Sequence, residues 1–158
     1  MSIHNVNYLL KTVAILLVFI ALPANSYADS ISVKHPYARA VPEGQPNSAA
    51  FMVLKNSSEQ DRALVNAKSN VSSFVELHTH KKENGMMRMR RVDQIDIKAN
   101  SETVLKPGGL HVMFIGLKHQ LKQDDEIDLE LIFDDGRNIK LSVPVKMVEG
   151  MKHMKKHK

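Results

Sequence analysis

The sequence contains no cysteine and no tryptophan, and aromatic residues make up only 5% of its 158 residues. Without cysteine the chain cannot form disulfides, zinc–thiolate sites, iron–sulfur clusters or a catalytic thiolate. It also cannot form a blue-copper electron-transfer centre, because that centre requires a cysteine thiolate. The length is typical of one domain. The hydrophobic fraction of 43% allows one core, built mainly from aliphatic residues and methionine.

The formal net charge of +5 is concentrated at the two ends of the chain. Lys11 supplies one positive charge, and residues 151–158 supply four more. Between residues 29 and 150, 17 basic residues are balanced by 17 acidic residues. Nucleic-acid binding needs a clustered basic face, so a neutral domain with a basic tail does not match it. We therefore expect no nucleic-acid partner.

Residues 1–28 have the pattern of a secretory signal peptide. Lys11 precedes an apolar run at 12–22, and Pro23 and a cleavage pattern ending at Ala28 follow. A helix of that run is only about 16 Å long against about 30 Å of hydrocarbon, so we expect no stable membrane span. No cysteine follows it for a lipid anchor. We expect cleavage after Ala28 and export to the periplasm.

Short apolar runs separated by turn residues fill the rest of the chain. In the segment 127–131 every second residue is apolar, which is typical of a strand with one buried face. Nine or ten such strands predict a single antiparallel β-sandwich or barrel over residues 29–150, followed by a flexible tail at 151–158. We expect strands at 31–35, 48–55, 62–67, 73–79, 86–92, 94–97, 102–105, 111–115, 126–133 and 138–145.

Four residues combine two imidazoles with two thioethers: His78, Met89, His111 and Met113. Thioether sulfur is soft and neutral and favours Cu(I), and imidazole adds a stronger donor. His111 and Met113 are two apart on one predicted strand, so they share a face while Val112 points into the core. Each methionine alone is more often core filler than ligand. Together the four residues predict a Cu(I) site.

The position of His78 relative to Met89 depends on the register of a hairpin whose turn is predicted at residues 81–85. Pairing centred between Glu83 and Asn84 places the two residues directly opposite each other. A two-residue turn at Asn84-Gly85 makes them diagonal neighbours on one face. Pairing centred on Asn84 would place them on opposite faces. Two of these three registers bring the two ligand types together.

The segments VELHTH at 75–80, MRMR at 87–90 and PGGLHVM at 107–113 resemble those of periplasmic copper chaperones of the PCuAC type. The copper motif of that family is His, ten residues, Met, twenty-one residues, His, one residue, Met, and this sequence matches it at all four positions. Tyr37 stands where many members have Trp, and Asp124 stands where Gly is common. Neither difference affects the four predicted ligands.

This resemblance implies a cupredoxin-like or immunoglobulin-like β-sandwich that binds Cu(I) in the periplasm without catalytic turnover. The implied acceptor is the dinuclear copper site of cytochrome c oxidase subunit II, reached directly or with a Sco-type thiol chaperone. We expect a monomer. Copper buffering or resistance is an alternative function. A small copper-dependent oxidase or monooxygenase is a second alternative, although a chain of this length leaves little room for a substrate pocket.

His80 lies two residues from His78 on the same strand face, and we expect it to be a bystander rather than an auxiliary ligand. The tail contains four further donors. It could capture a second copper as Cu(II), or it could be a solvated basic segment near an anionic surface. The four donors of the tail are Met151, His153, Met154 and His157.

Overall fold

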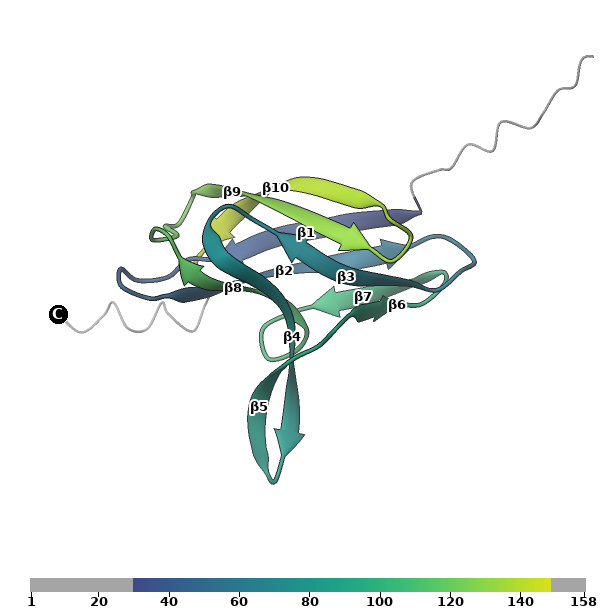
Figure 1. The fold of residues 1–158 in the computed structure, drawn as a ribbon, viewed down its shortest axis with the longest axis horizontal. Coiled ribbons are helices and arrows are strands. Elements are labelled where there is room, and N and C mark those ends of the chain that lie inside the picture. The colour runs from purple at the N-terminus through teal and green to yellow at the C-terminus, as the bar shows by residue number, and fades with distance from the viewer. Residues whose placement is uncertain (1–29, 149–158) are drawn as a thin grey trace, which may run out of the picture.

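The computed structural model describes residues 30–148, and every regular element in that range is a β-strand (Figure 1). No helix of these residues is long and apolar enough to cross a membrane. The predicted leader and tail lie outside the described residues. The ten strands are β1 (Ile31–Arg39), β2 (Asn47–Asn56), β3 (Arg62–Lys68), β4 (Ser72–Glu83), β5 (Met86–Arg91), β6 (Ile95–Ile97), β7 (Ser101–Leu105), β8 (His111–Leu117), β9 (Glu126–Phe133) and β10 (Asn138–Lys146).

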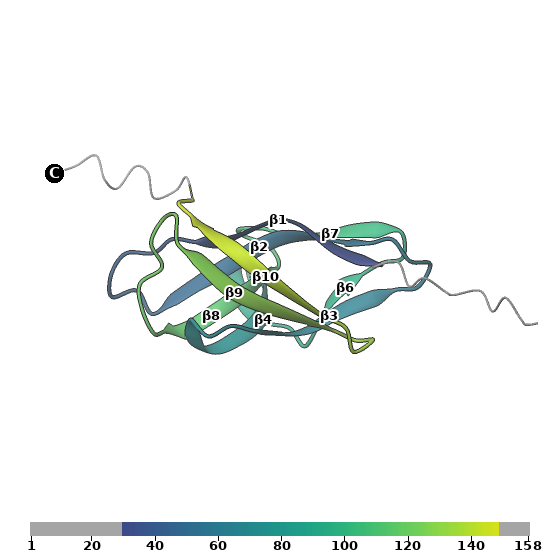
Figure 2. The same cartoon turned by 90° about the horizontal axis from the view of Figure 1, so that it is seen from above.

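The strands form one continuous hydrogen-bonded sheet in the order β5-β4-β8-β2-β1-β10-β9-β3-β6, and β7 pairs with β2. Most strands run along the long axis of the domain (Figure 2). Side chains from both halves of this path, such as Phe114 of β8 and Leu131 of β9, meet in one buried core. The predicted all-β sandwich is therefore confirmed. The expectation of purely antiparallel pairing was wrong at one place, because β1 and β10 pair in parallel. No hairpin joins these two strands, so no tight turn forces them to run in opposite directions.

The hairpin of β4 and β5 extends beyond the rest of the domain (Figure 1). Its strands continue to Glu83 and restart at Met86, so Asn84-Gly85 is the whole turn. Both turn residues have positive φ, 49° and 83°, as a type I′ turn requires. The turn is shorter than the predicted segment 81–85 because Asn-Gly is the preferred dipeptide for this geometry.

Strand β2 is buried on both faces. Ala50, Met52 and Leu54 belong to the core, whereas Ala49 and Phe51 on the alternate positions are buried outside that core cluster. These two residues form the floor of the outer face, next to β8. The outer face is therefore partly apolar and shielded from water at this point.

Candidate metal centre

The register of three neighbouring strands brings the four predicted ligands to one face of the sheet. His78 of β4 lies directly opposite His111 of β8, and Met89 of β5 lies opposite His80. Met113 shares the face of His111, while Val112 between them is fully buried in the core. The observed register of β4 and β5 is the one predicted for a two-residue turn at Asn84-Gly85, and it makes His78 and Met89 diagonal neighbours. The adjacency of β4 and β8 could not be predicted from the sequence.

The His111 imidazole is almost completely buried, at 2% exposure, and is held by the turn that precedes β8. Pro107-Gly108 forms this turn, with a positive φ of 77° at Gly108 and a hydrogen bond from the Gly109 amide to the Lys106 carbonyl. The turn presents the Gly109 carbonyl to His111 Nδ1 at 2.9 Å. A carbonyl only accepts, so Nδ1 carries the proton. The lone pair is then on Nε2, where a metal can bind.

The His78 imidazole is oriented by a carboxylate. Its Nε2 lies 2.7 Å from Glu76 Oε2, and an ionised carboxylate accepts, so Nε2 donates the proton. Nδ1 then carries the lone pair. That atom is buried and has no hydrogen-bond partner. A buried acceptor without a partner is costly unless another group satisfies it, and a metal ion would do so.

Glu76 is a functional residue that the sequence analysis missed. It lies two residues before His78 on the same strand face and directly opposite Met113. Its second oxygen is 3.5 Å from the Arg91 guanidinium, which projects from β5 opposite His78. Metal-binding histidines commonly donate their other ring proton to a carboxylate, which fixes the tautomer and strengthens the donor. The alternation of residues on β4 was the available signal, but it did not distinguish Glu76 from a solvent-facing carboxylate.

The two thioethers differ in their access to solvent. Met113 is half-buried between β4 and β2, opposite Glu76 on one side and Ala49 on the other. Met89 is 41% exposed on β5, which is an edge strand of the sheet. Within residues 30–148, no three His, Cys, Asp or Glu side chains converge as a ready metal site. Metal binding on this face would therefore depend on sulfur as well as nitrogen.

Burial lowers the pKa of His111 below its ordinary value of 6.5, and the nearby His80, His78 and Arg39 side chains lower it further. The Gly109 carbonyl opposes this effect in part. His111 is thus neutral in the folded protein at neutral pH, which is the form that can bind a metal.

This shift predicts that the metal-free protein loses stability on acidification. The unfolded chain binds the His111 proton at a higher pH than the folded chain, so unfolding becomes easier as pH falls from about 7 through about 6. Carboxylates such as Glu102, whose pKa is lowered by Lys34, contribute only at lower pH. Urea unfolding at several pH values should show this loss, and His111→Gln should reduce the slope. Replacing the exposed His119 by Gln should leave it unchanged; equal slopes in all three proteins would contradict the assignment.

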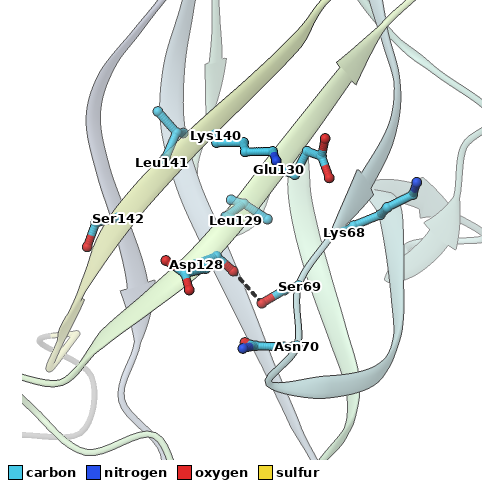
Figure 3. Close-up of a pocket in the computed structure, with 9 residues that line it drawn as sticks. All are labelled: Lys68, Ser69, Asn70, Asp128, Leu129, Glu130, Lys140, Leu141 and Ser142. Atoms are coloured by element: carbon cyan, nitrogen blue, oxygen red, sulfur yellow. Dashed lines mark hydrogen bonds between the residues drawn. The ribbon is translucent and has the colours of Figure 1, made fainter.

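A shallow depression lies elsewhere, over residues 68–70 and strands β9 and β10 (Figure 3). Its lining is mixed in charge, with Lys68, Asp128, Glu130 and Lys140, and Ser69 donates a hydrogen bond to the Asp128 carbonyl. It contains no histidine and no methionine. This depression does not offer the soft donors that are found on the face of β4, β5 and β8.

A family model described as putative lipoprotein LpqE-like matches residues 31–145. The chain belongs to the LpqE-like family. Putative lipoprotein Lxx21020 of Leifsonia xyli subsp. xyli is 34% identical to this LpqE-like chain over 124 residues, covering 78% of this chain and 74% of the relative. Uncharacterized protein RP573 of Rickettsia prowazekii is 30% identical over 128 residues, covering 78% and 69% of the two chains.

Solved structures of PCuAC proteins share the fold of this LpqE-like chain. The solution structure of CuI-DR1885 from Deinococcus radiodurans has a TM-score of 0.62 and 32% identity, and the match covers 78% of this chain and 85% of that one. The copper-bound PCuAC domain from PmoF2 has a TM-score of 0.65 at 23% identity, with 75% and 94% covered. The predicted relationship to the PCuAC proteins and the cupredoxin-like fold are confirmed.

Proposed function

We propose that this chain is a periplasmic metallochaperone that binds Cu(I) through His78, Met89, His111 and Met113. The observation that carries the proposal is the buried His78 Nδ1, which has no partner although Glu76 holds the other ring nitrogen. His111 is prepared in the same way by the Gly109 carbonyl. Copper is the cargo, and the chain itself performs no turnover.

The chemistry of the four donors supports Cu(I) rather than a harder ion. Two thioethers and two imidazoles match the preference of Cu(I) for soft ligands. The chain has no thiolate that could be oxidised in an oxidising compartment. Copper-bound relatives include CuI-DR1885, which is 32% identical to this chain.

The exposure of Met89 supports delivery to another protein. Its thioether lies on an edge strand, where an incoming thiolate can reach the ion before the buried His111 releases it. We propose as acceptor the dinuclear copper site of cytochrome c oxidase subunit II, either directly or with a Sco-type thiol chaperone. Export through the leader at 1–28 agrees with the lipoprotein names of the family and of Lxx21020.

Anaerobic Cu(I) titration of the chain without its leader, against a competing chelator, tests the proposal. We expect one tightly held Cu(I), with X-ray absorption showing both sulfur and nitrogen ligands. Mixing the loaded protein with the copper-free soluble domain of oxidase subunit II should transfer the ion. Several weakly held coppers without transfer would favour the alternative function of buffering or resistance, and no Cu(I) binding would overturn the proposal.

The Glu76–His78 hydrogen bond predicts a separate effect on affinity. Glu76→Ala should weaken Cu(I) binding by about 10-fold to 100-fold, because loss of such a carboxylate partner typically has that effect. Glu76→Gln should have an intermediate effect, since the amide oxygen can still accept the hydrogen bond from His78 Nε2. Competition with a chelator measures both.

The control for this effect is Glu102→Gln. Glu102 is an exposed carboxylate of β7 that pairs with Lys34 on β1, away from the candidate site. Its replacement should leave Cu(I) affinity unchanged. The ¹⁵N chemical shifts of the His78 ring should change in the Glu76 variants alone; identical shifts in all proteins would show that Glu76 does not set the tautomer.

A further inference from the structure

The β4–β5 hairpin continues past the rest of the sheet as a two-stranded ribbon. Strand β4 pairs with β8 only as far as His78, whereas its pairing with β5 continues to Glu83, opposite Met86. The ribbon therefore projects from the domain (Figure 1), and all six residues of β5 are exposed. A two-stranded hairpin alone is at best marginally stable in water. Packing within the domain thus does not explain why the ribbon extends so far.

Two methionines form an apolar tip directly after the turn. Met86 and Met87 follow Asn84-Gly85 and are 56% and 59% exposed. Neighbouring residues of a strand point to opposite faces, so one methionine lies on each face of the ribbon. A protein surface docked flat against one face could cover only one of them. A medium that surrounds the tip would cover both.

Basic residues surround this tip. Residues 81–91 contain five basic residues and one acidic residue, a net charge of +4. Lys82 pairs with Met87, and Lys81 and Arg88 form the next pair along the ribbon. At about 3.4 Å per residue, these cations lie about 3–7 Å along the ribbon from the first methionine. Because Lys81 and Lys82 are neighbours on one strand, positive charge lies on both faces of the ribbon.

The one acidic residue of the hairpin is neutralised by an arginine. Glu83 accepts two hydrogen bonds from the Arg90 guanidinium, at 3.0 Å and 2.5 Å. Within residues 30–148, neither Lys81 nor Lys82 makes an ion pair. Charged residues on an edge strand also prevent unwanted strand pairing, but that role does not explain two exposed methionines at the tip. An anionic bilayer binds both features, since apolar side chains enter the interface and basic side chains contact the headgroups.

We propose that the tip of the β4–β5 hairpin docks the protein on the surface of an anionic phospholipid bilayer. Met86 and Met87 enter the headgroup interface, and the basic residues beside them contact lipid phosphates. The contact is peripheral and spans no membrane. It goes beyond the proposed function and does not require copper. It would place Met89, three residues from the start of β5, close to the bilayer surface.

Cosedimentation of the copper-free protein with vesicles tests the charges. All proteins lack the leader and carry glutamine in place of the tail lysines. Vesicles of equal parts phosphatidylglycerol and phosphatidylcholine should bind the parent, and phosphatidylcholine alone should not. Lys81→Gln with Lys82→Gln should weaken binding about 30-fold, since each cation near an anionic surface contributes about fivefold. Lys68→Gln with Lys140→Gln, at the depression over β9 and β10, removes equal charge and should weaken binding less than about threefold.

The apolar tip is tested with the same vesicles. Met86→Ser with Met87→Ser should weaken binding about tenfold, whereas leucine at both positions should retain it. Because the chain has no tryptophan, Met87→Trp provides a single fluorescent reporter. Its emission should shift to the blue on binding and be quenched by lipids with brominated acyl chains. Phe74→Trp, an exposed site where β4 pairs with β8, is the control and should show neither change.

Three outcomes would overturn the proposal. Unchanged binding in the double serine variant, with no quenching of the tryptophan at 87, would indicate a general polyanion surface that suits an acidic protein instead. An equal loss in the two double lysine variants would show that the hairpin has no special part. Binding that requires the tail lysines would place the contact on the tail. Circular dichroism checks the fold of each variant. Copper titration tests the proposed function separately, so that either can fail alone.

Discussion

Replacing both Met89 and Met113 by leucine should lower Cu(I) affinity by about 100-fold or more while the fold is retained. Leucine matches methionine in volume but has no lone pair, so the two imidazoles alone would hold the ion. Both side chains lie on the outer face, and volume-conserving substitutions cost less than about 1.5 kcal/mol even in a core. Chelator competition measures affinity, and far-ultraviolet circular dichroism and urea unfolding measure the fold.

Met86→Leu is the matched control for this double variant. Met86 lies on β5 like Met89, but three residues away and on the opposite face of the hairpin, where it pairs with Glu83. Its replacement should leave Cu(I) affinity unchanged. Retained high affinity in the Met89/Met113 variant would show that these thioethers are not the ligands.

Phe114→Ala should leave Cu(I) affinity nearly unchanged but destabilise the fold. We expect the free energy of unfolding to fall by about 3–5 kcal/mol. Phe114 is the neighbour of Met113 on β8, but it points to the other face and is completely buried in the core. Removing its ring leaves a cavity among tightly packed strands. Because small domains are stable by only about 5–15 kcal/mol, urea or thermal unfolding should shift markedly.

Phe74→Ala tests whether the burial of Phe114 is the cause of the loss of stability in Phe114→Ala. Phe74 is 66% exposed on β4, so its removal should change the unfolding free energy by only about 0.5 kcal/mol. At a temperature where Phe114→Ala is still folded, its Cu(I) affinity should stay close to that of the parent. A loss of less than about 1 kcal/mol in Phe114→Ala would contradict the assigned core.

Local patterns in the sequence were enough to predict most of the strands and part of the site. Alternation places His111 and Met113 together on any strand, and the Asn84-Gly85 dipeptide favours the two-residue turn that was observed. The parallel pairing of β1 with β10 was not predictable, because residues at the two ends of the domain carry no local signal of their contact.

The contact of β4 with β8 is the main feature that the sequence could not reveal. More than thirty residues separate His78 from His111, with β5, β6 and β7 between them. Only the assembled sheet shows that these histidines are directly opposite each other and that Glu76 faces Met113. The role of Glu76 depends on a side-chain contact with His78, which alternation permits but does not specify.

The outward side chains of β5, β4 and β8 are regularly spaced, so one metal-binding side chain can be replaced by another at the same position. Neighbouring strands are about 4.8 Å apart and alternate residues about 6.8 Å apart, and the core lies on the other side of the sheet. A substitution at an exposed outward position such as Met89 therefore changes a ligand without opening a cavity in the core. Selection on metal preference and selection on folding can then act on separate sets of residues. Relatives that keep Val112 and Phe114 as the inner set could diverge in cargo while retaining the same sandwich.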